Sequence, residues 1–338
     1  MSQFLKYSIF NRKYSIIHNK EIILIKVFAI KSTKFTTKRL NMLIRIAKTF
    51  KQALFPTRCL VCRSFFHLGQ HKNCDLKPGA TDADSSNIGQ EFIEKIVLTS
   101  AHDDYYFRNI PEVFEKLMAP FLCPTCSSGF LAVESPKCSR CGMVFKSRQG
   151  EDHVCGECLD SSNRFRIARS AGVYKYTFMA VIQCFKYKGK IQLAQPLGIL
   201  LFAAFISFWD KMNIDIIVPV PLHAKKLRIR GFNPSFLLVK DWVRIAQLLN
   251  VRLPDILVDI NVLARRKWTE PQAGLGRKER LANIKNAFNI SNGSKITGKK
   301  ILLVDDVYTT GATANECAKV LLKGGAGHVD VLTLARAI

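Results

Sequence analysis

The second half of this chain alternates short apolar runs with longer stretches in which apolar residues recur at helical spacing. The short runs are typical of buried strands and lie at residues 172–176, 215–221 and 301–304. The longer stretches predict helices at residues 179–190, 193–209, 236–249 and 312–322. Strands that alternate with helices are typical of an α/β fold, and open sheets of this kind bind ligands beyond the carboxyl ends of their strands.

The loop between the last predicted strand and helix carries the strongest candidate chemistry. Two carboxylates, Asp305 and Asp306, follow the strand. Small and hydroxyl residues then lead into the helix: Thr309, Thr310, Gly311, Ala312 and Thr313. Glycine permits close backbone approach, and the amides at a helix start favour an anionic phosphate. The carboxylates need another partner, such as sugar hydroxyls or a divalent cation that the ligand itself holds.

This pattern therefore predicts a site for a sugar that bears a terminal phosphate. The alternative is an ordinary strand-to-helix turn with two solvated aspartates.

The length of the chain limits the number of domains, and its net charge limits the kinds of partner. At 338 residues the chain has room for one full domain and a smaller one, and 48% hydrophobic residues supply a core. The formal net charge of +25 implies attraction to phosphates, whether in a small ligand, in nucleic acid or in an acidic membrane. Charge alone does not choose among these partners.

Eight of the eleven cysteines form four Cys-x-x-Cys pairs, a spacing typical of metal ligands rather than of disulfides. Two pairs complete a tetrahedral four-thiolate zinc site with no position open for water, so we expect two structural zinc ions. Sequence order predicts one site from Cys59, Cys62, Cys123 and Cys126, and another from Cys138, Cys141, Cys155 and Cys158. An interleaved pairing, and free or redox-active thiols, are alternatives. Reduced thiols indicate a cytoplasmic protein.

The first 41 residues carry nine Lys or Arg against one acid, Glu21. Such an arm either docks on nucleic acid or lipid or is a loosely ordered extension, and Met42 is an alternative start. The apolar run at residues 22–30 is broken by Lys26 and is too short to span a bilayer. We therefore expect no transmembrane segment, and no cleavage site indicates a signal peptide.

Residues 63–122 separate the first cysteine pair from the second and have the composition of an insertion. Its His67, His71 and Cys74 are either solvated side chains or additional metal ligands. The expected parts of the chain are a basic extension at residues 1–41, a cysteine-rich zinc-binding part at 42–165 with the insertion at 63–122, and an α/β domain at 166–338.

Two further segments are expected near the predicted site. The strand at 215–221 leads into a cationic loop that contains Lys225, Arg228, Arg230 and Gly231. This loop would lie beyond the carboxyl end of its strand, and a solvated basic turn is the alternative. Residues 263–283 are polar, basic and glycine-bearing, and form either a mobile flap over a charged ligand or a simple surface loop.

Residues 301–313 resemble the phosphoribosyl pyrophosphate (PRPP) signature of type I phosphoribosyltransferases. With the four cysteine pairs and several short motifs, the chain resembles the ComF family over about residues 42–338, apart from the insertion. The motifs are Phe185-Lys-Tyr-Lys-Gly, Val218-Pro-Val-Pro-Leu, Arg230-Gly-Phe-Asn, Thr269-x-x-Gln272, Arg280-x-x-Asn283 and Ala287-Phe288. The family implies a cytosolic protein with an N-terminal double zinc ribbon and a type I phosphoribosyltransferase-like domain, associated with DNA uptake in naturally competent bacteria. That domain has a Rossmann-like, largely parallel sheet flanked by helices.

The resemblance also implies roles for the candidate residues. Asp305 and Asp306 would hold the ribose hydroxyls of PRPP, which binds as its Mg²⁺ complex, and residues 309–313 would hold the 5′-phosphate. Arg230 and Gly231 resemble the pyrophosphate loop, with cations from Lys225 and Arg228 nearby. The flexible loop would contribute Thr269, Gln272 and Arg280.

The chain departs from the family pattern in two places. Pro234 stands where Gln is common, which puts the turn after the pyrophosphate loop in doubt, and residues 63–122 lengthen the first ribbon. Ser2 follows Met1 where an amidotransferase of this class would have a cysteine nucleophile, so we do not expect the protein to make its own ammonia.

Two functions fit the sequence. In the first, the protein is a phosphoribosyltransferase that transfers phosphoribose to an acceptor with release of pyrophosphate. In the second, it is a non-enzymatic accessory protein of competence that binds single-stranded DNA or competence proteins and keeps the PRPP pocket as a sensor or relic. Aromatic residues among cations at 145–146 and 185–190 would serve that second function as stacking platforms. The acceptor and the oligomeric state have no signal in the sequence.

Overall fold

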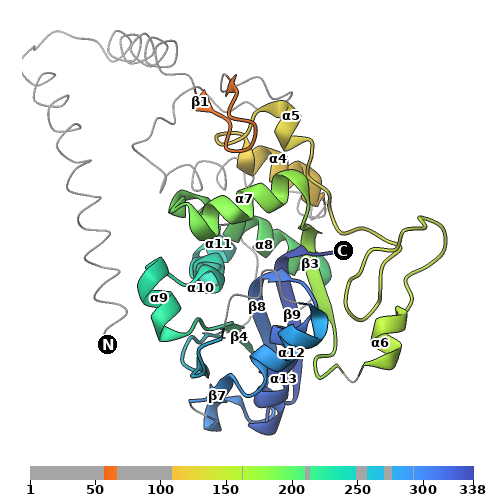
Figure 1. Ribbon diagram of the computed structural model, residues 1–338, viewed down its shortest axis with the longest axis vertical. Coiled ribbons are helices and arrows are strands. Elements are labelled where there is room, and N and C mark those ends of the chain that lie inside the picture. Colours follow the sequence, from red (N-terminus) through yellow and green to blue (C-terminus); the bar gives the residue numbers. More distant parts are fainter. Residues whose placement is uncertain are drawn as a thin grey trace, which may run out of the picture. The chain divides into compact units, whose positions relative to one another are not determined.

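A computed structural model of the chain describes residues 57–66, 109–161, 163–209, 214–248, 257–269, 276–291 and 293–338 (Figure 1). All of these residues belong to one compact unit. The predicted basic arm, the candidate ligands His67, His71 and Cys74, and Gln272 lie outside the described residues, as does the side chain of Arg280.

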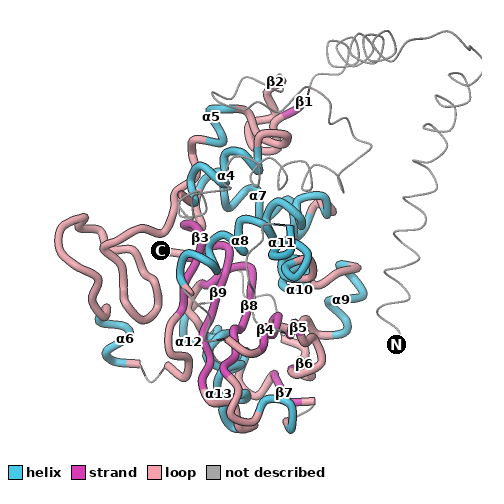
Figure 2. Tube along the Cα trace, turned by 180° about the vertical axis from the view of Figure 1, so that it is seen from behind, coloured by secondary structure: helices cyan, strands magenta, loops and turns pink. Residues whose placement is uncertain are grey.

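The core of the unit is a five-stranded sheet in which every pair of neighbours is parallel. In spatial order its strands are β3 (Ala168–Val173), β9 (His328–Arg336), β8 (Lys300–Tyr308), β4 (Ile216–Pro219) and β5 (Leu257–Val258), as Figure 2 shows from behind. The predicted α/β fold with a largely parallel sheet is therefore confirmed. β9 and β5 were not among the predicted strands.

Helices cover both faces of this sheet. Ile301 and Leu303 of β8 lie in one buried cluster with residues of α13 (Ala312–Lys323). Leu302 and Val304, which alternate with them and are also buried, face the opposite side, where α8 (Ala194–Phe208) and α10 (Pro234–Val239) pack. A strand that is buried on both faces reads as a continuous apolar run, which is why residues 301–304 were recognisable in the sequence.

The long apolar helix of the fold is a core element. Among the described residues, one helical stretch, Ile191–Phe208, is long and apolar enough to cross a membrane by length and composition, but 61% of it is buried inside the protein. It consists of the short helix η2 (Ile191–Leu193) and α8. A Cβ on Gly198 would lie 2.8 Å from the Leu238 carbonyl oxygen, so glycine allows α8 to approach α10 closely. This packing is that of a core helix in a globular domain.

A second group of helices packs around three aromatic rings. α4 (Ile110–Met118), α5 (Pro124–Ser127) and α7 (Tyr176–Tyr187) surround Phe114, Phe130 and Phe178, whose centroids lie 4.1–5.5 Å apart. The last residues of the predicted insertion thus form α4, which also packs against α8.

Some predicted boundaries were wrong. The strand predicted at 172–176 is β3, which ends at Val173, and α7 already begins at Tyr176. The helix predicted at 236–249 consists of α10 and α11 (Trp242–Leu248), separated at Lys240.

The segment predicted as a flap or surface loop contains regular structure. Its first strand, β6 (Leu263–Arg265), pairs with β7 (Phe288–Ile290), and α12 (Arg277–Ile284) lies between them in sequence. The remaining short elements are β1 (Thr57–Arg58), β2 (Phe65–Phe66), α6 (Gly156–Asp160) and η3 (Ser294–Ile296).

Candidate active site and cysteine clusters

Asp305 and Asp306 lie on β8 at the point where the sheet narrows. β4 ends opposite Val304, whereas β9 continues to pair with β8 as far as Tyr308. The strand end predicted after Val304 was therefore wrong, because pairing with β9 extends β8 by four residues. The acidic pair stands on a rigid strand, yet it remains at the carboxyl edge of β4, where ligands bind in sheets of this kind.

Asp306 forms an ion pair with Lys186, near the carboxyl end of α7. The Nζ to Oδ1 distance is 2.9 Å, and the Lys and Asp side chains are only 15% and 12% exposed. Burial by itself would lower the pKa of Lys186, but the charge of Asp306 and the hydrogen bond to it raise that pKa above its ordinary value. Lys186 therefore stays charged beside the acidic pair.

Asp305 is held by two donors. The Ser235 hydroxyl, at the start of α10, donates to Oδ1 over 3.0 Å, and the Asp306 amide donates to the same oxygen over 2.9 Å. Burial and the neighbouring charge of Asp306 raise the pKa of Asp305 to about 7, although Lys186 and both hydrogen bonds act against this rise. The site can therefore gain or lose a proton near neutral pH.

Pro234 fits the turn that the sequence left in doubt. Asn233 caps α10 by accepting a hydrogen bond from the Ser235 amide over 3.1 Å, and its Nδ2 donates to the Val220 carbonyl over the same distance. Pro234 occupies the first turn of the helix, where a missing amide hydrogen costs nothing. The departure from the family pattern is compatible with the helix that brings Ser235 to Asp305.

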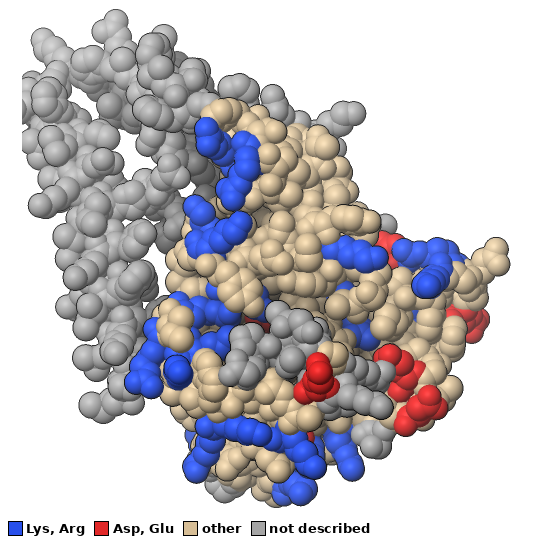
Figure 3. Space-filling view, viewed as in Figure 1, with Lys and Arg blue, Asp and Glu red and all other residues tan. Residues whose placement is uncertain are grey.

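The predicted cationic loop is a short helix, α9 (Ala224–Arg230), which Gly231 ends with a φ of 82°. Lys225 and Arg228 on it are exposed, and Arg230 is half-buried with its guanidinium 4.9 Å from the centre of the Tyr187 ring. On the face seen in Figure 3, Lys and Arg side chains gather over α9.

Three further cations belong to this site, although the sequence did not single them out as site residues. They are Lys186, Lys226 and Arg265. Burial lowers the pKa of Lys226, and the nearby charges of Arg230, Arg265 and Lys186 lower it further. Burial also lowers the pKa of Arg265, which the charge of Asp305 partly offsets. The cations therefore interact with one another, and Lys186 and Arg265 interact with Asp306 and Asp305, respectively.

Sequence reasoning missed these residues because a basic residue in a helix or strand usually lies on a solvated face. The available signal was the stretch that begins at Phe185, which the family resemblance already included.

Residues 309–313, here called the phosphate loop after the role that the sequence predicts for them, connect β8 to α13. Gly311 has a φ of 76°, and a Cβ there would lie 2.2 Å from the Tyr308 hydroxyl oxygen. The Thr310 hydroxyl accepts a hydrogen bond from the Ala312 amide, and the Thr309 carbonyl accepts one from Arg336. Thr313 lies in the first turn of α13, so the predicted residues do surround a helix start that can bind an anion.

Thr269, predicted as part of a flexible loop, is buried in the structure. The Arg265 Nη2 donates a hydrogen bond to its hydroxyl. The neighbouring Trp268 is 37% exposed, and the Lys225 ammonium lies 4.9 Å from the centre of one of its rings. Thr269 is therefore fastened to β6, the first strand of the predicted flap, and the neighbouring Trp268 lies beside α9.

The cysteine pairs group in sequence order. The first cysteine cluster contains Cys59, Cys62, Cys123 and Cys126, and the second contains Cys138, Cys141, Cys155 and Cys158. Within each cluster the four sulfur atoms lie within 4.8 Å of one another, so the interleaved pairing does not occur.

The sulfur geometry fits zinc. Cys62 and Cys123 have sulfurs 3.7 Å apart, and Cys141 and Cys155 have sulfurs 3.8 Å apart. Zinc with bonds of about 2.3 Å to sulfur separates its tetrahedral ligands by about 3.8 Å. Both four-cysteine clusters thus fit a double zinc ribbon and leave no ligand position for water.

In the second cysteine cluster, backbone amides donate to one of the four sulfur atoms. The amides of Cys141 and Cys155 each donate to the Cys138 sulfur over 3.3 Å. Burial opposes ionisation there, but these backbone donors lower the pKa of the Cys138 thiol to about 6, which favours the metal-binding thiolate. Asn163 donates to the Cys158 sulfur over 3.4 Å.

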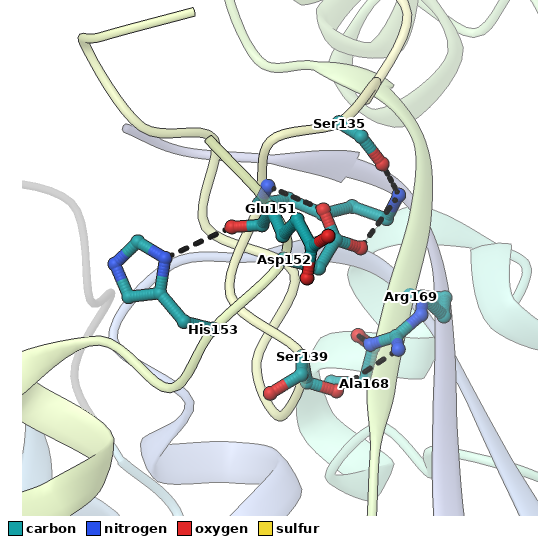
Figure 4. Close-up of polar contacts among 8 residues, drawn as sticks. Ser135, Ser139, Glu151, Asp152, His153, Ala168 and Arg169 are labelled. Atoms are coloured by element: carbon teal, nitrogen blue, oxygen red, sulfur yellow. Dashed lines mark hydrogen bonds and ion pairs between the residues drawn. The ribbon is translucent and has the colours of Figure 1, made fainter. Parts of the chain in front are cut away.

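Polar contacts close the loop that carries this cluster, as Figure 4 shows. The Lys137 amide donates to Asp152 over 2.9 Å, so residues on either side of the loop are joined. Arg169 of β3 donates to the Ser139 carbonyl over 2.9 Å, between two predicted zinc ligands, Cys138 and Cys141. The second cluster is thereby fastened to the edge of the parallel sheet.

Comparison with known proteins finds relatives whose names refer to competence or to DNA utilization. The chain is 31% identical over 220 residues to competence protein F of Haemophilus influenzae, an alignment that covers 64% of this chain and 90% of that protein. It is 28% identical over 221 residues to the DNA utilization protein YhgH of Escherichia coli K12, covering 64% and 91%. It is 29% identical over 225 residues to competence protein ComFC of Bacillus subtilis, covering 64% and 84%. No protein-family model matches the chain.

Proposed function

This chain belongs to the ComF family, and from that membership and the surroundings of Asp305 and Asp306 we propose that it binds PRPP with magnesium and serves DNA uptake. The relatives' names supply the link to competence and to DNA utilization. The single observation that supports the ligand is the acidic pair on β8, which precedes the phosphate loop and interacts with the half-buried cations Lys186, Lys226 and Arg265.

In this proposal each side chain has a place in ligand binding. Asp305 and Asp306 accept hydrogen bonds from the ribose hydroxyls, and the phosphate loop binds the 5′-phosphate through backbone amides and hydroxyls. Magnesium arrives with the ligand and, when bound, neutralises charge on the pyrophosphate oxygens. Lys226 and Arg230, whose charges lie close enough to repel each other, would bind the pyrophosphate end of the ligand.

The reaction that follows is transfer of phosphoribose. The bond between ribose carbon 1 and the pyrophosphate oxygen breaks, pyrophosphate leaves with the electron pair, and an acceptor forms the new bond to carbon 1 and loses a proton. Positive charge develops on the ribose as the bond breaks, and the negative charges of Asp305 and Asp306 would stabilise it. Preorganised cations of α9 stabilise the departing pyrophosphate. We place this activity in the cytoplasm, where thiols remain reduced.

Calorimetry with PRPP and Mg²⁺ tests the binding step. We expect heat of binding for the parent protein and none for the double variant Asp305→Asn/Asp306→Asn. Asp215→Asn is the matched control, because Asp215 precedes β4 and so lies at the opposite edge of the parallel sheet, where it accepts a hydrogen bond from the Lys300 amide. A parent protein that binds no PRPP in the presence of magnesium would refute the proposal.

The transfer step needs a separate assay. Release of pyrophosphate should be measured while nucleobases and small amines are offered in turn as acceptors. If the protein binds PRPP but releases no pyrophosphate with any acceptor, it is a PRPP-binding protein and not a transferase.

A second function, binding of single-stranded DNA, is supported by two exposed aromatic side chains beside the site. Tyr187 is 66% exposed and Trp268 is 37% exposed, and each has a cation 4.9 Å from the centre of its ring. Exposed rings among cations are suited to base stacking. Phe185, predicted to share this role, is fully buried, so that part of the prediction was wrong.

Fluorescence anisotropy with a labelled oligothymidylate tests this second function. We expect salt-sensitive binding that Tyr187→Ala combined with Trp268→Ala weakens about tenfold or more, because stacking contributes about 1–3 kcal/mol per base. The Asp305→Asn/Asp306→Asn variant should bind the oligonucleotide as well as the parent. Absence of binding at low salt would exclude this function.

A further inference from the structure

Arg336, the last residue of β9, contacts both the phosphate loop and the second cysteine cluster. Its side chain is buried, with the residue only 2% exposed. Nη1 donates a hydrogen bond to the Thr309 carbonyl, and Nη2 lies 3.6 Å from the Cys141 sulfur. One guanidinium group therefore joins a predicted ligand-binding loop to a predicted zinc ligand.

The same guanidinium has a second route to the loop through Tyr308. Its central carbon lies 4.2 Å from the centre of the Tyr308 ring. The hydroxyl of that ring lies against Gly311, since a Cβ on this glycine would be 2.2 Å from it. A shift of Arg336 would therefore disturb the phosphate loop at its first residue and at its glycine.

The interaction of Arg336 with the Cys141 sulfur depends on whether that sulfur binds zinc or carries a proton. A zinc-bound cysteine is a thiolate, and a guanidinium donates more strongly to a charged sulfur than to a neutral thiol. Donors to metal ligands fix the orientation of those ligands and usually matter for metal affinity. Arg336 is suited to both tasks because its planar, forked group can hold two acceptors at once.

We propose that Arg336 is a positioning residue that couples zinc in the second cysteine cluster to binding of the PRPP 5′-phosphate at the phosphate loop. The proposal deepens the proposed function and rests on it only for the identity of the ligand. Coupling of this kind is reciprocal: bound zinc holds the loop ready for phosphate, and bound phosphate slows the loss of zinc. In this proposal the second zinc site influences ligand binding in addition to stabilising its own fold.

Arg169 supplies a matched control. It is half-buried, and its Nη2 donates to the Ser139 carbonyl within the turn of the same cysteine cluster (Figure 4). Its other hydrogen bond goes to the Ala168 carbonyl, away from the phosphate loop. Arg336→Lys keeps the charge but cannot hold Thr309 and Cys141 together, whereas Arg169→Lys perturbs the cluster alone.

Amide hydrogen exchange of residues 309–313 in the full-length protein tests the coupling without any ligand. Removal of zinc by a chelator should speed exchange in the parent about tenfold. Zinc-loaded Arg336→Lys should already exchange at the faster rate, and zinc-loaded Arg169→Lys should behave like the zinc-loaded parent. Equal exchange in the two lysine variants, or no response of the parent to zinc removal, would overturn the proposal.

Zinc release to a chromophoric chelator tests the reverse direction. PRPP with magnesium should slow release from the buried second cluster of the parent by about fivefold, and this effect should vanish in Arg336→Lys. If Arg336→Lys fails to fold, the parent protein still tests the proposal. Zinc release from the parent at the same rate with and without bound PRPP would overturn the coupling. If calorimetry detects no PRPP binding, the proposed function fails, while the exchange experiment still decides the role of Arg336.

Discussion

The ammonium group of Lys186 lies 2.9 Å from the carboxylate of Asp306, although the two residues are 120 positions apart in the sequence. The contact joins α7 to β8 and places a fixed positive charge beside the acidic pair. Because both side chains are largely shielded from water, each charge should depend on the other for its stability.

Replacement of Lys186 by Met should destabilise the protein strongly. Loss of the ammonium leaves Asp306 as an uncompensated, mostly buried charge, which typically costs about 3–5 kcal/mol. Urea denaturation should show this loss. Lys240→Met is the control, because Lys240 and Asp241 form a more exposed pair at 3.0 Å, worth less than about 1 kcal/mol. Similar losses for the two variants would contradict the importance of burial.

Stability should depend on pH through Asp305. Its pKa of about 7 in the folded protein lies above its ordinary value of 3.8, so the folded form binds more protons between about pH 4 and pH 7. The free energy of unfolding should therefore fall as pH rises through this window, by at most about 1.4 kcal/mol per pH unit. In Asp305→Asn this decline should be smaller, as urea denaturation at several pH values can establish. A variant with the pH dependence of the parent would show that Asp305 does not titrate there.

Ser235 should favour the ionised form of the Asp305 carboxyl group. Its hydroxyl lowers the pKa of Asp305, so Ser235→Ala should raise that pKa and weaken PRPP binding about tenfold at neutral pH. Calorimetry at higher pH should recover part of the loss. Ser128→Ala removes a similar hydrogen bond, to the Thr125 carbonyl beside the first cysteine cluster, and should leave PRPP binding unchanged. A loss that does not respond to pH would indicate a purely structural role for Ser235.

The phosphate loop should tolerate no side chain at Gly311. Gly311→Ala combines a left-handed backbone with a contact of 2.2 Å to the Tyr308 hydroxyl. Gly298→Ala has a similar φ of 70° but open space around the new methyl group, and should cost about 1–2 kcal/mol. Gly311→Ala should cost more than this and abolish PRPP binding, as thermal denaturation and calorimetry will show. Equal stability of the two variants would mean that Tyr308 moves aside freely.

Elemental analysis should find about two zinc ions per chain. Cys126→Ser and Cys158→Ser should each reduce this number to about one, because each variant removes a ligand from a different cluster. Cys62 is exposed, whereas three cysteines of the second cluster are buried, so a chelator should empty the first cluster sooner. A chain that retains both ions after either substitution would contradict the ligand assignment.

The sequence by itself determined the local elements whose signals are short in range. The apolar run at residues 301–304, the acidic pair and the small residues after it are contiguous, so their order specifies a strand, an acidic edge and a helix start. The cysteine spacing likewise determined the four pairs, because a Cys-x-x-Cys turn aims two sulfurs at one point, whereas the structure decided which pairs group together. Family membership followed from the same motifs.

Only the tertiary structure decided which distant groups share the site. Lys186, Arg265 and Ser235 come from separate elements. The motif that begins at Phe185 marked Lys186 only through the family resemblance, and the local patterns of Arg265 and Ser235 do not reveal that they interact with Asp305. The true end of β8 was also beyond local reasoning, since pairing with β9 and not the polarity of Asp305 decides where the strand stops. Arg336 is the clearest case: an arginine at the end of an apolar strand has no recognisable role until the fold brings Cys141 and Thr309 to either side of it. Short-range patterns fix helices and strands, whereas the partners of a buried charge are chosen by packing over the whole domain.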